Sequence, residues 1–374
     1  MGTAQGRPQE RGSGVTLAMV ARRAGVSPQT VSNAINAPEL LRPETLARVR
    51  QAIDTMGYRP HRAAQTLRTK SSRLIGYGIQ PVDVDRSTPV MDRFLHALSQ
   101  TAQEAGHRIL LFASPPPNAP EPMDAYRELL DTYSVDGFVL SDTHRGDPRQ
   151  AWLEKHGVPF AAFGRPWSGR QIGDWVDVDG ARGTAAAVDH LVELGHDRIG
   201  FLGWPRGSGA GDDRAGGWRD AMRRHGLTVR GRRAESEDEV TPAAAAVGPL
   251  LDSGVTAVVA ASDTLAMGCY RALRERGQSP GEDVSVVGFD DSPAAALVSP
   301  SLTSVDQPMA AVGRECVRLL LARIADPSRA AENLLLAPSL VPRDSTAPPR
   351  ATAPRTAAPR GPDSRATDES HSPR

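Results

Sequence analysis

The sequence predicts two unlike folded parts, a small all-α domain at residues 15–60 and an α/β region at residues 74–342. Residues 15–60 repeat apolar side chains at helical spacing and contain no strand-like run. Residues 74–342 alternate short apolar runs with longer helical patterns, which is typical of parallel sheets covered by helices on both faces. A region of about 270 residues is large for one such sheet, so we expect two lobes.

The two ends of the chain differ from the parts between them. Residues 1–14 and 343–374 are polar and contain almost no large apolar side chains, so we expect both to be disordered tails. The chain carries no net charge, but residues 1–73 hold 12 Lys and Arg against 4 Asp and Glu. This asymmetry indicates either contact with a polyanion or a solvated basic end.

Composition narrows the class of protein further. The two cysteines, Cys269 and Cys316, predict buried thiols and no disulfide framework. No run of about 18 apolar residues predicts a membrane span, and the first residues lack the apolar stretch of a signal peptide. We therefore expect a cytoplasmic protein without a membrane partner.

The all-α domain has the signals of three helices. An apolar stripe at residues 17–24 is followed by Gly25, which can end a helix in the left-handed conformation. Ser27 is a suitable N-cap and Pro28 fits the first helical position of a second helix that extends to about Asn36. A third helix is expected at residues 43–57. Two short helices joined by a tight turn with glycine form a helix-turn-helix unit, although a helical bundle without DNA has the same outline.

The elements of the α/β region follow from the apolar runs. Strands are expected at residues 74–79, 108–113, 136–141, 159–164, 175–179, 198–203, 257–262 and 284–290. Helices are expected at residues 91–105, 181–194, 217–225, 265–276 and 310–325.

The polar side chains of the second helix suit contact with DNA. Gln29 and Asn33 can make the paired donor and acceptor contacts that read adenine edges in the major groove. Arginine side chains, backbone amides and helix N-termini would contact phosphates and supply affinity.

Several short motifs together resemble the lactose-repressor (LacI) family over residues 15–342. At the N-terminal end they are residues 15–17, 20–21, 24–27, 30–32, 57–60, 63–64 and 67–68. In the α/β region they are residues 176–179, 190–191, 194–196, 198–203, 214, 217–218, 262–264 and 287–291. The resemblance implies a helix-turn-helix reader, a hinge at residues 61–73 and a two-lobed fold of the periplasmic-binding-protein type I class that binds an effector and forms a homodimer.

The same resemblance implies which residues contact a palindromic operator. Pro28, Gln29 and Asn33 would face the bases, and Ser32 lies on the same helix. Phosphate contacts would come from Thr16, Ser27, Thr30 and Asn36. The family often has an acidic residue at the position of Met19 and arginine at that of Asn33, so the operator sequence cannot be transferred from a relative.

The segment at residues 61–68 resembles the family's hinge helix. It is too short to be stable alone, and by resemblance it folds when paired in a dimer on DNA. Leu67 would then wedge into the minor groove at the operator centre and kink it. Without the resemblance, a plain linker would be the simpler interpretation.

The α/β region carries side chains that suit a sugar. Asp290 follows a predicted strand and can accept hydrogen bonds from hydroxyl groups, while Arg214 and Arg165 can donate several. Four tryptophans lie between residues 167 and 218, and an indole face can stack on a sugar ring. From this group we expect Trp167 and Trp218 to contact ligand, with Asp263 as a further candidate carboxylate.

Other chemistries are disfavoured. The glycines at residues 207–211 match neither a dinucleotide fingerprint nor a phosphate loop, so we expect a flexible loop at residues 204–217 and no cofactor. The acid pairs at residues 177/179 and 290/291 are interpreted as caps and turns, with no metal ligands or catalytic residues beside them.

The sequence therefore predicts a transcriptional regulator, not an enzyme. By resemblance it is a repressor whose operator affinity responds to a monosaccharide or oligosaccharide between the lobes, with corepression left open. The alternatives are a sugar-binding protein of a transport system, which would need a signal peptide, and a sugar-modifying enzyme, which would need a catalytic acid pair.

Overall fold

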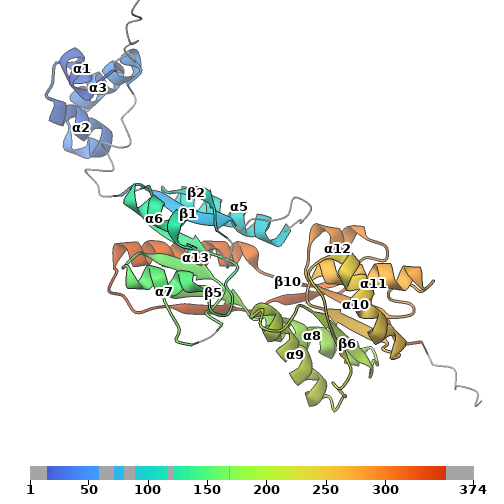
Figure 1. Cartoon of the computed structure of the whole chain (residues 1–374). Helices are drawn as coiled ribbons and strands as arrows, with labels where there is room; N and C mark the ends of the chain where they lie inside the picture. The colour runs from blue at the N-terminus through green and yellow to red at the C-terminus, as the bar shows by residue number, and fades with distance from the viewer. Residues whose placement is uncertain are drawn as a thin grey trace, which may run out of the picture. The chain divides into compact units, whose positions relative to one another are not determined.

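The computed structural model describes residues 15–58, 71–79, 89–115, 121–132, 134–167 and 169–350. The predicted hinge segment at residues 61–68, with Leu67, lies outside these ranges. These ranges form a helical domain (residues 15–58) and an α/β domain (residues 71–350), both drawn in Figure 1.

The helical domain consists of three helices and one short turn of 3₁₀ helix. Its elements are α1 (Leu17–Ala24), α2 (Pro28–Asn36), η1 (Pro38–Leu40) and α3 (Pro43–Met56). Val20, Val31 and Val49, one from each α-helix, are fully buried together with Tyr58. The predicted three-helix unit is confirmed, with the boundaries that the sequence signals indicated.

The α/β domain contains two six-stranded sheets. The first sheet has the order β11 (Asn333–Leu336), β5 (Asp174–Val178), β4 (Phe160–Phe163), β3 (Gly137–Leu140), β1 (Leu74–Ile79) and β2 (Arg108–Ala113). The second has the order β12 (Ser339–Val341), β10 (Thr303–Asp306), β9 (Ser285–Asp290), β8 (Ala257–Ala260), β6 (Ile199–Gly203) and β7 (Arg233–Glu235). We call the parts built on these sheets lobe 1 and lobe 2, and their presence confirms the predicted two-lobed α/β architecture.

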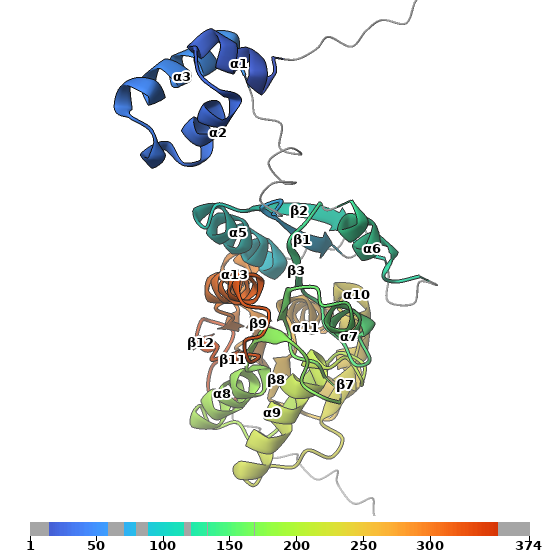
Figure 2. The same cartoon turned by 90° about the vertical axis from the view of Figure 1, so that its left-hand side faces the viewer.

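The helices divide between the lobes. Lobe 1 contains α5 (Pro89–Glu104), α6 (Asp124–Asp131), α7 (Pro148–Lys155) and α13 (Met309–Ala325). Lobe 2 contains α8 (Gly180–Glu193), α9 (Ala210–Arg224), α10 (Val240–Asp252), α11 (Asp263–Glu275) and α12 (Pro293–Leu297). Helices α8 and α9 form one packed pair and α10 and α11 a second, and the two pairs cover opposite faces of the lobe 2 sheet (Figure 2).

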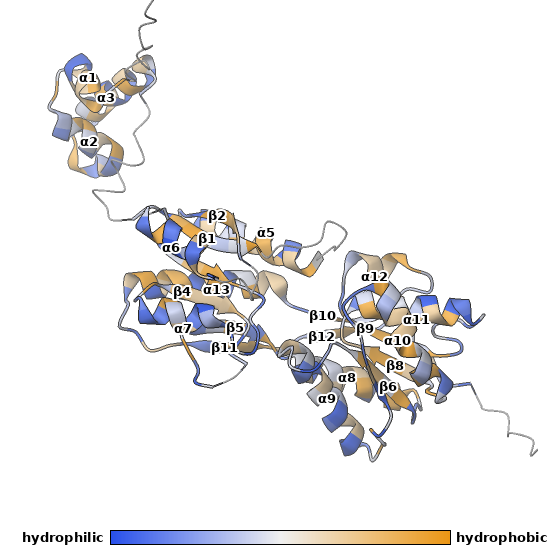
Figure 3. Cartoon of the chain, in the orientation of Figure 1, coloured by the Kyte–Doolittle hydropathy of each residue, from blue (hydrophilic) through white to orange (hydrophobic). Residues whose placement is uncertain are grey.

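The core of lobe 2 lies between its sheet and these helix pairs. Phe201, Phe289 and Leu202 are fully buried there, with the alanines and valines of β8. Figure 3 colours β8 as hydrophobic. The sequences of these inner strands are apolar at nearly every position because parallel strands are covered by helices on both faces. This is why continuous apolar runs located the inner strands correctly in the sequence.

The chain passes between the lobes three times, after β5, between β10 and α13, and between β11 and β12. The last passage gives each sheet one edge strand from residues 333–341. β12 pairs antiparallel with β10, whereas β10 with β9, β9 with β8, β8 with β6 and β6 with β7 pair in parallel.

Four strands and four helices were missed at the sequence level. β7 has the sequence Arg-Ala-Glu, β12 also has three residues and β10 has four, so neither apolar runs nor alternation marked these strands. The expected loop at residues 204–217 is also wrong beyond residue 209, because α9 begins at Ala210 and places Asp212 and Asp213 in its first turn. Carboxylates at that position are favoured by the helix dipole.

The disordered tail predicted from residue 343 onward starts too early in the sequence, because the folded part of the chain extends to residue 350. Residues 343–350 are described and bonded to the lobe 2 sheet: the Ser345 main chain and hydroxyl bond to Val286, and Ser345 is fully buried. The composition of this segment suggested disorder because its contacts are hydrogen bonds and not apolar packing. Residues 351–374 lie outside the described ranges.

Two neighbouring glycines of α9 test the packing of α8 against α9. A Cβ on Gly217 would lie 2.0 Å from the Ala181 carbonyl oxygen of α8, whereas the nearest atom to a Cβ on Gly216 is 3.7 Å away. We expect Gly217→Ala to lower the free energy of unfolding by about 3 kcal/mol through overpacking. Gly216→Ala should raise it by about 0.5–1 kcal/mol through helix propensity. Urea denaturation measures both, and equal stabilities would contradict this close approach.

Candidate functional site

The turn between α1 and α2 is fixed by local chemistry. Gly25 has φ +65° and its amide donates to carbonyls of α1. The Ser27 hydroxyl accepts the Thr30 amide at 3.1 Å, and Pro28 occupies the first turn of α2. These features pre-set the angle at which α2 leaves α1, as the sequence signals predicted.

The residues predicted to contact DNA gather at the start and along one side of α2. Thr16 caps α1 by accepting the Met19 amide at 3.3 Å. Gln29 Nε2 donates to Asn33 Oδ1 at 2.9 Å, so the two amide side chains are held side by side, one turn apart. The other predicted residues on this helix are partly or fully exposed, namely Ser27, Pro28, Thr30, Ser32 and Asn36.

A cavity of about 650 Å³ lies in the α/β domain and is lined from both lobes. Its polar lining follows the carboxyl ends of strands, as expected for open parallel sheets. From lobe 1 come Asp142 after β3, Trp167 after β4 and Asp177 in β5. From lobe 2 come Trp204, Ser208, Asp213, Arg214, Asp238, Asp263, Thr264, Asp290, Ser292 and Gln307.

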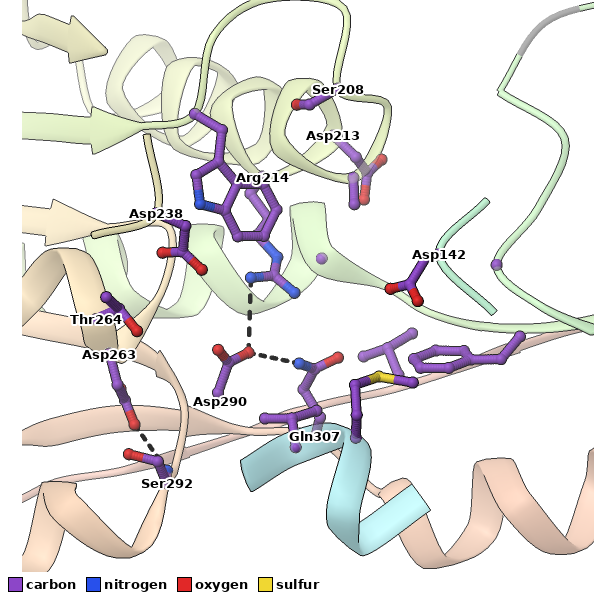
Figure 4. Close-up of a pocket in the computed structure, with 18 of the residues that line it drawn as sticks. Asp142, Ser208, Asp213, Arg214, Asp238, Asp263, Thr264, Asp290, Ser292 and Gln307 are labelled. Atoms are coloured by element: carbon purple, nitrogen blue, oxygen red, sulfur yellow. Dashed lines mark hydrogen bonds and ion pairs between the residues drawn. The ribbon is translucent and has the colours of Figure 1, made fainter. Parts of the chain in front are cut away.

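Arg214 and Asp290 meet on the lobe 2 side of the cavity (Figure 4). Their side chains are 3.6 Å apart. The Arg214 guanidinium also donates to the Ala261 carbonyl at 2.5 Å and lies over the rings of Phe289 and Trp204 at 3.7 and 5.0 Å. It is therefore held in one orientation with one edge toward Asp290.

Burial raises the pKa of the Asp290 carboxyl to about 7. Arg214 opposes this shift, and the carboxylates of Asp263 and Asp238 add to it. Gln307 Nε2 donates to Asp290 Oδ1 at 2.6 Å, which favours the ionised form. Asp290 also has φ +112°, a conformation that is costly for a residue with a side chain and is maintained only by the surrounding structure.

Asp263 lines the cavity, but both of its carboxylate oxygens accept hydrogen bonds from other residues of the protein. They accept the Ser304 hydroxyl at 2.6 Å and the Ser292 amide at 2.7 Å. Burial raises the pKa of Asp263. This carboxylate fixes the segment that follows Asp290, the last residue of β9, and that carries Ser292.

Trp167 and Arg165 are positioned as a unit on lobe 1. The Arg165 guanidinium lies 4.7 Å from the Trp167 ring centroid and donates to Asp177 at 2.7 Å. Trp167 Nε1 donates to Thr143 at 3.2 Å, and the indole covers Gly209, where a Cβ would lie 2.5 Å from the ring. Trp167 lines the cavity, whereas Arg165 stands behind Asp177 and is not part of the lining.

The expectation that Trp218 contacts ligand does not match its position. Trp218 is 3% exposed and stacks on Phe201 in the core, with 5.5 Å between ring centroids. It lies on α9 one turn beyond Arg214, on the side that faces the sheet. Trp204 takes the place at the cavity instead, because it follows directly on β6.

Several lining residues were missed at the sequence level. Asp142 directly follows the expected strand at residues 136–141, so its position was a usable signal. Asp213 fell in the segment expected to be a loop, and Gln307 follows the unpredicted strand β10. Asp238 lies in an irregular segment between β7 and α10, where no pattern marks it.

Two polar atoms of the lining are buried without a hydrogen-bond partner in the described part of the chain, Trp204 Nε1 and Ser208 Oγ. Unsatisfied buried donors are costly, which suits a site completed by water or a ligand. Among the described residues, no group of three or more His, Cys, Asp or Glu side chains is placed to hold a metal ion. No helix in the described ranges is both long and apolar enough to cross a membrane.

Comparison with known proteins places these features in a family. A model described as "Bacterial regulatory proteins, lacI family" matches residues 16–61, and one described as "Periplasmic binding protein-like domain" matches residues 188–346. The HTH-type transcriptional regulator CelR of Thermobifida fusca is 34% identical to the chain over 342 residues, which span 90% of the chain and 99% of CelR.

Solved structures agree with this assignment. A CelR–cellobiose complex has 31% sequence identity and a TM-score of 0.67, covering 88% of this chain and 99% of that one. The lac repressor dimer bound to operator and the anti-inducer ONPF has 28% identity and a TM-score of 0.78, covering 90% and 100%. The chain therefore belongs to the LacI family of bacterial regulatory proteins, whose members found here are transcriptional regulators and not enzymes.

Proposed function

We propose that this protein is a sequence-specific DNA-binding repressor that acts as a homodimer and releases its operator when a sugar-like effector enters the cavity. One observation carries the proposal. The same chain holds a helix with exposed amide side chains in a helix-turn-helix and a cavity that combines a fixed arginine–carboxylate pair with two indoles.

The side chains of α2 support the DNA-binding part. Gln29 and Asn33 present their amides together, and a paired amide is the group that reads the adenine edge in the major groove. Thr16 and Ser27 are exposed at the N-termini of α1 and α2, where backbone amides attract phosphate oxygens. α2 is the element that enters the groove in this proposal, and Leu67 remains the proposed minor-groove wedge.

The cavity supports a sugar as effector. Asp290 and Arg214 offer acceptors and donors for adjacent hydroxyls, and Trp167 and Trp204 offer apolar faces for a ring. A volume of about 650 Å³ is large enough for a small saccharide. The complex of the related CelR with cellobiose is consistent with this class of ligand.

A related structure supports the dimer. The related lac repressor is a dimer on its operator, and two copies would match a palindromic site.

The contacts between lobes suggest how the effector acts. Arg93 of α5 in lobe 1 donates to the main-chain oxygens of Asp290 and Asp291 in lobe 2. Arg165 of lobe 1 lies 3.5 Å from Asp213 of α9. A ligand that binds Asp290 and Asp213 alters the atoms that join the lobes, and it shifts the DNA-binding equilibrium only through its different affinity for the two lobe arrangements.

The first prediction concerns base reading. Gln29→Ala and Asn33→Ala should each weaken binding to the selected operator by about 1–3 kcal/mol and leave non-specific DNA binding nearly unchanged, because amides contact bases and not phosphates. Gln51→Ala, at an exposed position of α3, is the matched control. The operator is recovered by selection from genomic DNA, and fluorescence anisotropy measures the affinity of each variant for the operator and for non-specific DNA. Equal losses on specific and non-specific DNA would refute base reading by α2.

The second prediction concerns the effector. Asp290→Asn should abolish the thermal stabilisation that a matching sugar gives the wild type, because specific ligands stabilise the folded state. Asp291→Asn is the control, since this neighbour pairs with Arg343 and does not line the cavity. Asparagine tolerates positive φ at both positions. An undiminished shift in Asp290→Asn would remove Asp290 from the site.

The third prediction is a pH dependence of sugar affinity. The raised pKa of Asp290, about 7, means that its carboxylate gains a proton as the pH falls from 8 to 6. A protonated Asp290 accepts hydrogen bonds poorly, so the association constant should fall by about tenfold over this range. Isothermal titration calorimetry at pH 8 and pH 6 measures the association constant. Equal association constants of the wild type at the two pH values would contradict the assignment of Asp290 to the sugar site.

A further inference from the structure

The cavity has a strong excess of negative charge, although the whole chain is neutral. Six carboxylates line it: Asp142, Asp177, Asp213, Asp238, Asp263 and Asp290. Among the described residues of the lining, Arg214 is the one arginine, there is no lysine, and His144 is the remaining titratable side chain. A cleft lined by one sign of charge concentrates its field on whatever enters it.

The protein neutralises some of these carboxylates but not all. Asp177 pairs with Arg165 at 2.7 Å and Asp290 with Arg214 at 3.6 Å. Asp142 has the Ser141 hydroxyl at 3.2 Å, and within the described ranges it forms no ion pair. Of the two carboxylates that lobe 1 contributes to the lining, Asp177 has an ion pair with an arginine and Asp142 has none among the described residues.

Arg149 acts electrostatically on the Asp142 carboxyl, but its hydrogen bonds go to other groups. The Arg149 guanidinium pairs with Asp147 at 2.7 Å and donates to the main-chain oxygens of Ser141 and Asp142 at 2.7 and 3.2 Å. It fixes the backbone that carries Asp142 and leaves the carboxylate of Asp142 open to the cavity. On the lobe 2 wall, the Asp238 carboxylate accepts the Ser262 hydroxyl at 2.5 Å and likewise forms no ion pair with a described residue.

The carboxylates also act on one another. Burial is the largest cause of the raised pKa of Asp290 and of Asp213; Asp263 and Asp238 add to it at Asp290, and Asp177 and Asp179 add to it at Asp213. A positive group among them would relieve this repulsion, whereas a phosphate or carboxylate would add to it. The negative charge of the cavity thus disfavours anionic ligands as well as favouring cationic ones.

The arrangement does not suit a bare metal ion. Figure 4 shows Asp142 and Asp213 on one side of the open volume and Asp238 and Asp263 on the other. No three acidic or histidine side chains of the described residues converge on one point. Charges spread around a cavity that also has two indole faces fit a larger molecule with hydroxyls and one cationic group.

We propose that the effector is an amino sugar, with its ring hydroxyls on Asp290 and Arg214 and its ammonium group on Asp142, and that acidic and phosphorylated sugars are excluded. This inference rests on the proposed function and names the charge class of its ligand. A hydrogen bond from an ammonium to a carboxylate contributes about 1.5–3 kcal/mol, which is roughly a tenfold to hundredfold gain in affinity.

The experiment compares sugars that differ in charge on a common skeleton. The probes are cellobiose, the β-1,4-linked glucosamine dimer, its N,N′-diacetyl derivative and cellobionate, together with glucose, glucosamine and gluconate, titrated calorimetrically into the full-length protein. At pH 7 and low salt, the amine should bind at least about tenfold more tightly than its neutral counterparts. The acids should show no saturable binding.

Two substitutions locate the effect. Asp142→Asn keeps the shape and the positive φ of the residue, and it should remove the preference for the amine. Asp220→Asn, at an exposed carboxylate of α9 outside the cavity, should retain the preference. The melting temperature without ligand checks that each variant is folded.

The outcomes separate this inference from the proposed function. If a neutral sugar binds as tightly as its amine, or an acid binds, the charge class is overturned while a sugar-controlled regulator stands. If the preference survives in Asp142→Asn, the assignment of the ammonium site is overturned. If no sugar of any charge binds the folded protein, the sugar-controlled regulator fails together with this inference.

Discussion

The geometry of the cavity depends on the burial of Arg214. An unpaired guanidinium in the protein interior would cost several kcal/mol, so its charge must be met by fixed partners. The Ala261 carbonyl, the Phe289 ring and the Asp290 carboxylate meet it, and they come from the ends of β8 and β9. The contacts of Arg214, on α9, therefore fix the ends of β8 and β9 relative to each other. The residues that line the cavity from lobe 2 lie around these contacts.

Lobe 1 has a counterpart in the group formed by Arg165, Asp177 and Trp167. Arg165 holds Asp177 and supports the Trp167 ring, and Trp167 in turn covers Gly209 of lobe 2. Glycine is needed there because its φ is +72° and a Cβ would strike the indole. Each lobe thus presents a rigid polar cluster to the cavity, and the atoms that bridge the clusters are few. Sparse bridging suits a switch, since few contacts must change when the lobes rearrange.

The sequence revealed the architecture more fully than the site. Capping and periodicity located the three helices of the reader, because Gly25, Ser27 and Pro28 act through local backbone geometry. Asp290 and Arg214 were found through family motifs. Trp218 was misassigned because α9 turns its apolar residues toward the sheet, and a side chain's direction on a helix depends on where that helix packs. Asp238 lies in an irregular segment, so only the tertiary structure brings it to the cavity.

The short segment at residues 333–341 makes both lobes sensitive to a late truncation of the chain. It supplies β11 to one sheet and β12 to the other, and the strand pairs of β12 continue into the bonded segment that ends near residue 350. A premature stop codon before residue 333 would strip an edge from both lobes at once and expose unpaired backbone on each. A frameshift at any codon before 333 would therefore damage both lobes, however late in the α/β domain it falls.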